Sequence, residues 1–359
     1  CTLNTKVVKV DREHPQRKLI ECAGEILKQG GLVAFPTETV YGLGGDGLNA
    51  SSSEKIYAAK GRPSDNPLII HIADMESLEG IVTQVPEEAR KLANAYWPGP
   101  LTMIFQKNYR VPYETTGGLE SVAVRMPSHP VARALIAAGG GYIAAPSANT
   151  SGRPSPTRAE HVKEDLSGRI EMILDGGEVE IGLESTIVDF TSDKPVILRP
   201  GYISQEMIAR VIGEVEMDKG LLITDSAVKP KAPGMKYRHY APKAGLTIVQ
   251  GNPEAVREYI NNQCKMQGEK GLRAGVISTD ENQEFYHAAV VKNIGRREDE
   301  EGIARHLFGI LRAFDEEDVD CIYSEAFDTP QMGQAIMNRL LKAAGHHIIY
   351  LEEQKEEIR

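Results

Sequence analysis

The chain has 359 residues, and its 51 aspartates and glutamates against 41 lysines and arginines give a formal net charge of −10. This length predicts two domains, and 41% apolar with 26% charged residues is typical of an ordinary globular protein. The composition excludes a helix spanning a membrane, which needs a run of about 18 apolar residues, and the acidic balance disfavours a broad nucleic-acid-binding surface.

Residues 1–205 alternate short apolar runs with short amphipathic segments. The runs predict strands, and the segments predict helices that begin at capping residues and end at glycines. The expected strands are residues 31–37, 67–73, 101–106, 121–127, 141–149, 169–177, 184–190 and 194–201, and the expected helices are residues 51–61, 129–140 and 157–168. Ser51 with Glu54, and Thr157 with Glu160, have the spacing of capping boxes. The alternation predicts a mixed α/β domain.

A Pro- and Lys-rich segment follows, and residues 206–245 are expected to form a linker. Pro230, Pro233 and Pro242 predict a stiff, extended chain. A simple spacer would not need aromatic and cationic side chains together, yet this segment contains Tyr237, Arg238, His239 and Tyr240.

From residue 246 onward the pattern returns to alternating strands and helices. The expected strands are residues 246–252, 272–279, 320–327 and 346–352, and the expected helices are residues 253–267, 300–317 and 332–345. This order predicts a smaller, Rossmann-like α/β domain over residues 246–359 with a parallel sheet. The domain carries no glycine fingerprint, so the sequence assigns it no ligand.

The stretch "GLGGDG", residues 42–47, matches the G-x-G-x-x-G pattern of dinucleotide-binding proteins. That function requires the glycines to open a helix and an acidic residue to end a strand about 20 residues later. Here the helix is expected to open only at Ser51, and Asp65 lies in a Pro-rich loop. A tight glycine turn that lets the backbone approach a neighbour closely is therefore favoured.

The stretch "AKGRPSDNP", residues 59–67, sets two cations and several hydrogen-bonding groups directly before an apolar run. It could be a solvated turn or a cradle for an anion. As a cradle, Lys60 would supply a compact charge, Arg62 a rigid fork for two phosphate oxygens, and Ser64 and Asn66 neutral donors.

Other polar residues lie at or beside predicted strand ends. Arg125 sits inside an apolar strand, where burial is costly without an anionic partner, and either an internal acid or a ligand anion would serve. Arg199 leaves another strand, Thr37 and Thr39 follow a third, and small polar residues at 147–151 follow a fourth. Together with the cations of residues 59–67, they predict one anion-binding cavity for a nucleotide or polyphosphate.

No spaced set of His, Cys and Asp residues indicates a metal site built from protein side chains. Mg²⁺ carried in on phosphates would leave little trace in the sequence. The cysteines (Cys1, Cys22, Cys264 and Cys321) are scattered, and residues 1–15 lack the apolar core of a secretory signal. Both features predict a reducing, cytoplasmic location.

Eight motifs taken together resemble the Sua5/YrdC family of threonylcarbamoyl-AMP synthases. In chain order they are "FPTETVYGLG", "KGRPSDNPLIIHI", "WPGPLT", "VAVRMPSHP", "PSANTSG", "GLESTIVD", "ILRPG" and "APGMKYRHYAP". Each is modest alone, but eight in order over about two thirds of the chain make the match specific. The last motif and the extra C-terminal domain resemble the longer Sua5 type.

The resemblance implies a YrdC-like twisted mixed α/β domain with a large cationic cavity, and a reaction of L-threonine, bicarbonate and ATP. The products would be threonylcarbamoyl-AMP and pyrophosphate. The adenylate would then feed N6-threonylcarbamoyladenosine formation at position 37 of tRNAs through a separate transferase.

The resemblance also implies roles for individual residues. The threonine-side residues would be Thr39, His71, Arg125, Ala145 and Ser185. The nucleotide-side residues would be Lys60, Arg62, Asn66, Ser121, Ser147, Asn149, Ser155 and Arg199. Tyr237, Arg238, His239 and Tyr240 would form a lid, and Lys60 and Arg62 would act directly in catalysis.

The implied chemistry needs no Ser/His or Cys/His nucleophile, because a threonine carbamate is already anionic and can attack the α-phosphorus of ATP itself. Two anions must instead be brought together, which fixed cations and Mg²⁺ make possible. The alternative from another class is an RNA-binding module of a tRNA-maturation factor. The acid-free linker supports it, and the overall acidity counts against it.

Overall fold

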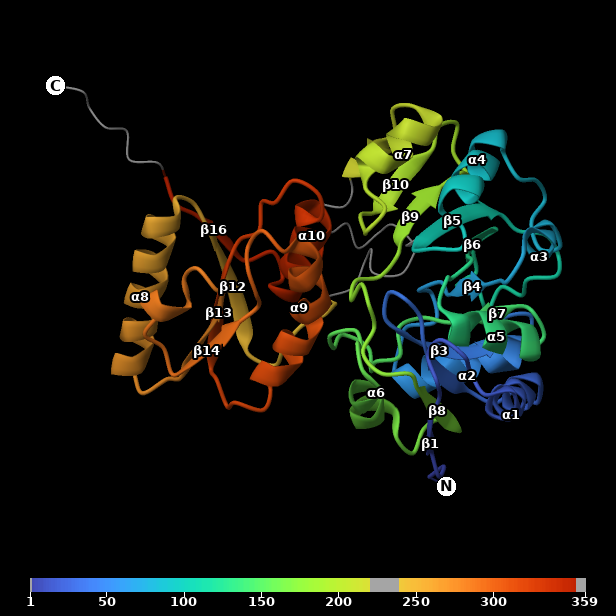
Figure 1. Cartoon of the computed structure of the whole chain (residues 1–359), viewed down its shortest axis with the longest axis horizontal. Coiled ribbons are helices and arrows are strands. Elements are labelled where there is room, and N and C mark those ends of the chain that lie inside the picture. Colours follow the sequence, from blue (N-terminus) through green and yellow to red (C-terminus); the bar gives the residue numbers. More distant parts are fainter. Residues whose placement is uncertain (1, 220–238, 353–359) are drawn as a thin grey trace. The chain divides into compact units, whose positions relative to one another are not determined.

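The computed structural model describes residues 2–219 and 239–352 and divides into two compact units (Figure 1). Unit 1 comprises Cys1–Ser151 with Ser155–Tyr237, and unit 2 comprises Gly152–Pro154 with Arg238–Arg359. Residues 220–238 of the predicted linker, including the lid candidates Tyr237 and Arg238, lie outside the described residues.

Unit 1 is built on an eleven-stranded sheet with the order β1-β8-β2-β3-β7-β4-β6-β5-β9-β10-β11. Its strands are β1 (Lys6–Lys9), β2 (Val33–Pro36), β3 (Tyr41–Asp46), β4 (Ile69–His71), β5 (Leu101–Gln106), β6 (Ser121–Arg125), β7 (Ile143–Ala144), β8 (Met172–Asp175), β9 (Thr186–Asp189), β10 (Val196–Arg199) and β11 (Glu216–Met217). Parallel pairs such as β4 with β6 alternate with antiparallel pairs such as β5 with β6. The mixed α/β prediction is confirmed.

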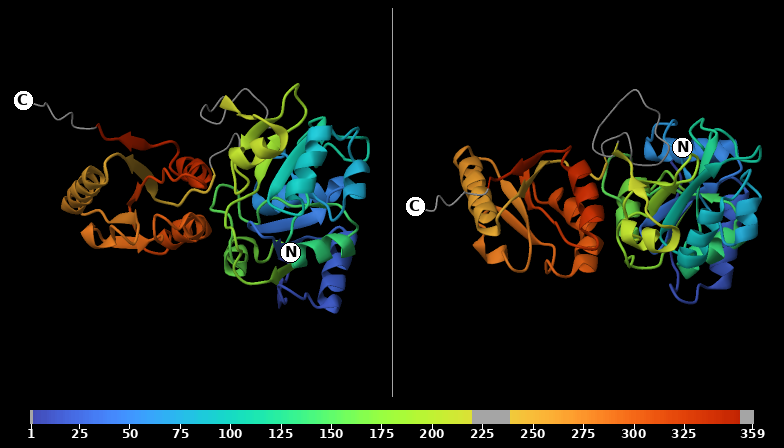
Figure 2. Two further views of the ribbon diagram at one scale, coloured as in Figure 1. Left: turned by 45° about the horizontal axis from the view of Figure 1, so that its top comes forward. Right: turned by 90° about the horizontal axis from the view of Figure 1, so that it is seen from above.

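The α-helices described in unit 1 cover different parts of the sheet (Figures 1 and 2). They are α1 (Arg17–Lys28), α2 (Ala50–Lys60), α3 (Met75–Glu79), α4 (Glu87–Tyr96), α5 (Pro130–Ala138), α6 (Ala159–Leu166) and α7 (Gln205–Ile212). On one face of β4, β5, β6 and β9, buried residues such as Leu78, Leu92 and Ile208 join α3, α4 and α7 to the sheet. That face is closed by apolar packing, so the opposite face is where a polar site can form.

The span expected to be a linker begins with structure that belongs to unit 1. Helix α7 packs against α4, and β11 pairs in parallel with β10. Unit 1 therefore continues through Met217.

Two predicted capping boxes are wrong, although both helices are present. The α2 helix is capped by Asn49, whose side chain accepts from the Ser51 amide, and it ends at Gly61 with a left-handed φ of 64°. The α6 helix begins after Arg158, with no side-chain cap. The amide of Thr157 is bonded instead to the ring of His161. Local hydrogen bonds other than the predicted pairs therefore define both helix starts.

The glycine-rich stretch at residues 42–47 is a strand rather than the predicted turn, because most of it forms β3. The expected close approach is present. A Cβ on Gly44 would lie 2.9 Å from the Phe35 ring, and one on Gly45 would lie 2.9 Å from the Ile56 side chain. Glycine here lets a strand lie flat against two bulky side chains.

Unit 2 has a five-stranded, fully parallel sheet with the order β14-β13-β15-β12-β16. Its elements are β12 (Gly245–Gln250), α8 (Pro253–Glu269), β13 (Ala274–Ser278), the 3₁₀ helix η2 (Gln283–Phe285), β14 (Val290–Asn293), α9 (Glu300–Phe314), β15 (Cys321–Glu325), α10 (Gly333–Ala343) and β16 (Ile348–Tyr350). Helix α8 covers one face, and α9 and α10 cover the other (Figures 1 and 2). The predicted parallel α/β architecture is confirmed.

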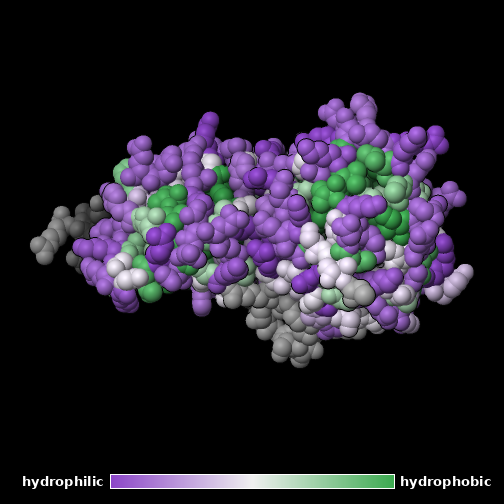
Figure 3. Space-filling model, turned by 90° about the horizontal axis from the view of Figure 1, so that it is seen from below, coloured by the Kyte–Doolittle hydropathy of each residue, from purple (hydrophilic) through white to green (hydrophobic). Residues whose placement is uncertain are grey.

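The surface is mostly hydrophilic on the face drawn in Figure 3, with smaller apolar patches on each unit. Exposed large apolar side chains include Tyr109 and Tyr350. Among the described residues, no helix combines the length and the apolar character needed to cross a membrane.

Candidate functional site

Five neighbouring strands of unit 1 place several candidate residues in one row across the sheet. His71 of β4 pairs with Arg125 of β6, which pairs with Thr102 of β5. Thr102 pairs with Ile187 of β9, and Ile187 pairs with Arg199 of β10 beyond a shift in register between Ile197 and Arg199. Directly paired residues point to the same face of a sheet. The row therefore faces away from α3, α4 and α7.

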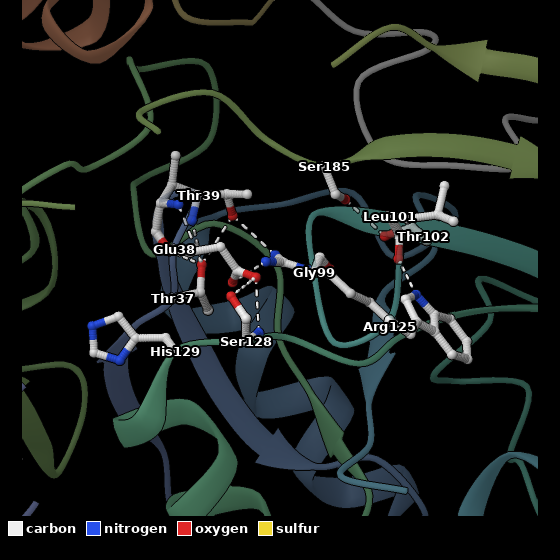
Figure 4. A network of polar contacts seen from close by, with 12 residues as sticks. Thr37, Glu38, Thr39, Gly99, Leu101, Thr102, Arg125, Ser128, His129 and Ser185 are labelled. Carbon is white, nitrogen blue, oxygen red and sulfur yellow. Dashed lines mark hydrogen bonds and ion pairs between the residues drawn. The ribbon is translucent and has the colours of Figure 1, made fainter. Parts of the chain in front are cut away.

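Arg125 lies at the centre of a buried polar network (Figure 4). Its side chain is 4% exposed and forms an ion pair with Glu38. Its Nη1 donates to Thr39 Oγ1 at 2.9 Å, and its Nε donates to the Gly99 carbonyl at 3.3 Å. Burial lowers the pKa of Arg125, and the charge of Glu38 opposes that shift.

Glu38 is the internal acid that the sequence left open as one partner for Arg125. Its second carboxylate oxygen accepts from the Ser128 amide at 2.8 Å and from the Ser128 hydroxyl at 2.7 Å. Sequence reasoning did not name Glu38. The available signal was its place between two threonines, directly after a buried strand.

The hydroxyl of Thr39 belongs to a chain of hydrogen bonds with a fixed direction. Thr37 Oγ1 donates its one proton to the Val40 carbonyl at 2.7 Å, since a carbonyl only accepts. The 2.9 Å contact between the two threonine hydroxyls must then be donated by Thr39. Thr39 also accepts from Arg125. Thr39 can therefore only accept from any further partner.

His71 is neutral at physiological pH. Burial lowers its pKa to about 3, and the positive charge of Arg125 adds to the shift. Its ring lies edge-on to Phe35 with centroids 6.4 Å apart, and Nδ1 lies 3.1 Å from the Ile69 carbonyl. A neutral ring can border an anion site without titrating.

Ser185 links the middle of the row to its end. Its hydroxyl lies 2.7 Å from the hydroxyl of Thr102. The guanidinium of Arg199 donates to the Ser185 carbonyl at 2.9 Å and to the hydroxyl at 3.3 Å. The structure thus brings a predicted threonine-side residue and a predicted nucleotide-side residue into contact.

Residues 59–67 are not a solvated turn. Lys60 is 3% exposed, and its amine donates to the carbonyls of Ser147 and Asn149. Arg62 is 8% exposed and donates to the Pro67 carbonyl at 2.7 Å. Ser64, expected to be a donor of the cradle, is exposed. The two cations are therefore held in the interior by backbone carbonyls.

Two predicted nucleotide-side residues have polar atoms without a described partner. Asn66 and Ser155 are 2% and 1% exposed, and neither Asn66 Oδ1 nor Ser155 Oγ hydrogen-bonds to any described residue. Buried polar atoms usually have partners. These two atoms are therefore available to a ligand.

The remaining candidates occupy strand ends and loops. Ala145 is buried directly after β7, and Ser147 is half-buried and paired with Gly42 in an isolated bridge. Ser121 is half-buried and begins β6. Among the described residues, no hydrogen bond joins the Lys60 group to the Arg125 network directly.

Of the four lid candidates, His239 and Tyr240 are described, and both belong to unit 2. Tyr240 is 4% exposed, has a φ of 63°, and lies against Phe308 of α9 with ring centroids 4.9 Å apart. Tyr240 is thus anchored in the core of unit 2.

No group of three or more His, Cys, Asp or Glu side chains within residues 2–219 and 239–352 could hold a metal ion. The site described above is built from arginine, lysine, hydroxyl and amide groups. Such groups suit an anionic ligand.

Family models match both units. The Sua5/YciO/YrdC model, described as "Telomere recombination", matches residues 25–201. The model described as "Threonylcarbamoyl-AMP synthase, C-terminal domain" matches residues 203–345.

Full-length relatives and a solved structure are similar over nearly the whole chain. The Bacillus subtilis threonylcarbamoyl-AMP synthase is 52% identical over 91% of this chain and 93% of its own, and that of Pyrococcus abyssi is 48% identical over 94% and 97%. The crystal structure of P. abyssi Sua5 complexed with L-threonine matches with a TM-score of 0.92 and 47% identity, covering 97% of this chain and all of that one, 100%. The chain therefore belongs to the Sua5-type threonylcarbamoyl-AMP synthases, which combine a YrdC domain with a Sua5 C-terminal domain.

Proposed function

We propose that the buried arginines of this row, Arg125 and Arg199, serve the reaction of L-threonine, bicarbonate and ATP to threonylcarbamoyl-AMP and pyrophosphate. The observation that carries this proposal is the register of β4, β6, β5, β9 and β10. It sets Arg125 and Arg199 on one sheet face with only two strands between them. Two fixed cations on one face suit a reaction that joins two anions.

Thr39, His71, Arg125, Ala145 and Ser185 are the proposed threonine contacts. Arg125 would pair with the threonine carboxylate. Thr39 would accept from the threonine amine or hydroxyl, since its own proton is committed to Thr37. Neutral His71 would border the same substrate, and P. abyssi Sua5 has been solved with L-threonine.

The proposed nucleotide contacts share a cationic or small polar side chain beside the loops of unit 1. They are Lys60, Arg62, Asn66, Ser121, Ser147, Asn149, Ser155 and Arg199. Lys60 and Arg62 would hold the triphosphate and stabilise charge at the reacting phosphorus. The buried acceptor on Asn66 and the hydroxyl of Ser155 would meet the nucleotide. Together these groups would form the predicted cationic cavity.

In the proposed mechanism the threonine amine adds to CO₂ or bicarbonate, and the resulting carbamate oxygen attacks the α-phosphorus of ATP as pyrophosphate leaves. The chain's part is to orient the two anions and offset their repulsion. We expect Mg²⁺ to arrive on the phosphates, where it supplies further charge neutralisation. A carbamate is short-lived in water, so a closing segment over the site would preserve it.

The predicted lid and partners remain proposals. Tyr240 is anchored on Phe308 in unit 2, so its part would be to hold the end of the lid in place. The product would pass to a tRNA threonylcarbamoyl transferase. The cytoplasmic location remains a prediction.

Pyrophosphate release tests the proposal. We expect release with ATP, threonine and bicarbonate together, and background release when threonine or bicarbonate is omitted. Serine in place of threonine should react more slowly. An RNA-binding module would release no pyrophosphate in the complete mixture, and equal release without threonine would refute the synthase mechanism.

A further inference from the structure

Arg125 needs an anionic partner inside the protein before it can bind a substrate, because an unpaired buried charge is strongly destabilising. Its side chain and that of Glu38 are 4% and 7% exposed. Glu38 neutralises the guanidinium inside the protein before any substrate arrives. The pair therefore allows a fixed cation to exist at this depth.

Glu38 is itself fixed from the side opposite Arg125. The Ser128 amide and hydroxyl donate to Glu38 Oε2, while Oε1 faces the guanidinium (Figure 4). Ser128 lies between β6, which carries Arg125, and α5. The same strand end thus holds both members of the pair in place.

The hydrogen bonds of Arg125 leave a defined part of it for a ligand. A guanidinium carries five N–H groups, and Arg125 uses one each toward Gly99, Thr39 and Glu38. Each terminal nitrogen therefore keeps a second N–H with no hydrogen-bond acceptor among the described residues. These N–H groups are charged donors that can bind the oxygens of a carboxylate.

We propose that Glu38 is a positioning residue for the amino-acid substrate: it holds Arg125 so that the two remaining N–H groups face the substrate carboxylate. This inference rests on the proposed function. Glu38 acts through Arg125 and touches no reacting atom. It therefore governs the affinity for threonine rather than the affinity for ATP.

A competing role for Glu38 predicts the opposite change in the KM for threonine. If Glu38 occupied the place of the substrate carboxylate on Arg125, threonine would have to displace it. Removing the charge of Glu38 would then tighten threonine binding. The two hydrogen bonds from Ser128 favour a fixed Glu38 over a displaced one. The direction of the change in the threonine KM separates the two roles.

The central experiment compares Glu38→Gln with wild type in the full chain. Glutamine keeps the shape, but its one carbonyl oxygen can face either Arg125 or Ser128, and its NH₂ group cannot accept from the other. The lost charge also leaves Arg125 uncompensated. We expect the KM for threonine to rise about 10- to 100-fold, with the KM for ATP changed less than about twofold. An unchanged or lowered KM for threonine, or an equal rise for ATP, would overturn the inference.

Ser128→Ala decides the question if Glu38→Gln does not fold. It removes one of the two donors to Glu38 Oε2, and we expect the threonine KM to rise roughly 3- to 10-fold. Glu38→Asp, which keeps the charge, should recover part of the threonine affinity lost in Glu38→Gln. A folded Ser128→Ala variant with the wild-type KM would count against positioning.

Glu325→Gln in unit 2 is the matched control, since it also neutralises a buried glutamate paired with an arginine. It should lower stability and leave both KM values unchanged.

Calorimetric titration of threonine alone separates the proposed function from the positioning role of Glu38. Wild type that binds threonine but releases no pyrophosphate would refute the proposed function, while the Glu38 variants would still test positioning through Kd. Absence of threonine binding in wild type would overturn both.

Discussion

The described part of each unit contains a buried glutamate paired with an arginine, Glu38 with Arg125 and Glu325 with Arg297, and the two pairs differ in how deeply the arginine is buried. In unit 1 the side chains of Arg125 and Glu38 are 4% and 7% exposed. In unit 2 Glu325 is 4% exposed, but its partner Arg297 is 37% exposed. Neutral donors complete the second network, because Asn282 and Tyr286 donate to Glu325 at 3.0 and 2.9 Å.

This difference indicates a different role for the buried charge in each unit. Unit 2 holds an anion whose hydrogen bonds are supplied from within the protein, which is typical of a structural network. Burial and the charge of Glu325 raise the pKa of Tyr286, so its hydroxyl stays protonated as a donor. Unit 1 holds a cation with two N–H groups left over. Spare N–H groups on a buried guanidinium are suited to binding an anion.

The largest expected effect comes from removing the buried arginine of unit 1. Arg125→Met leaves Glu38 as an uncompensated buried charge. It should lower the free energy of unfolding by about 3–5 kcal/mol and abolish threonine-dependent pyrophosphate release. Urea unfolding and turnover assays measure the two effects. A stable Arg125→Met variant would show that Glu38 needs no cationic partner.

Arg62→Ala should affect catalysis more than folding. Its guanidinium donates to the backbone carbonyls of Asn66 and Pro67, and its charge is the one proposed to stabilise the reacting phosphorus. We expect kcat/KM to fall by about 3–4 kcal/mol of transition-state stabilisation. Steady-state kinetics with ATP as the varied substrate test this. Wild-type turnover would remove Arg62 from the proposed catalytic group.

Acidification should destabilise the protein through His71. Its pKa is lowered to about 3 in the folded chain, against about 6.5 in the unfolded chain. Between these two pH values the unfolded state binds a proton on His71 and the folded state does not. The stability that His71 contributes is therefore complete above pH 6.5 and is lost as pH falls. At pH 5 the loss is about 2 kcal/mol.

His71→Asn should flatten this pH dependence of unfolding between pH 7 and pH 5. Some slope should remain, because burial also lowers the pKa of His129 to about 4. Urea unfolding at both pH values measures it. Identical slopes in wild type and variant would mean that His71 is charged in the folded protein.

The smallest effect is expected at the exposed arginine of unit 2. Arg297→Met should cost about 1 kcal/mol or less, because the guanidinium is partly solvated and Asn282 and Tyr286 still satisfy Glu325. Threonine-dependent turnover should not change. A cost equal to that of Arg125→Met would erase the distinction between the two pairs.

Long apolar runs made most strands and helices predictable. The strands β5 and β6 fall within the expected residues, and so do the helices α8, α9 and α10 apart from their ends. Helices α1 and α4 were not predicted, although their buried stripes follow helical spacing. The capping pattern did not predict where α2 begins, because Asn49 and Ser51 are both suitable capping residues and only the local backbone distinguishes them.

The sequence by itself determined the family, the two α/β parts and the residue types of the proposed anion site, because these follow from local patterns and ordered motifs. Only the tertiary structure decided which acid meets Arg125, that Lys60 and Arg62 of "AKGRPSDNP" are buried, and that Thr39 can only accept. Those facts depend on strand register and on loops far apart in the chain. Glu38 and Ser128 are 90 residues apart in sequence and meet at one carboxylate, which no local pattern encodes.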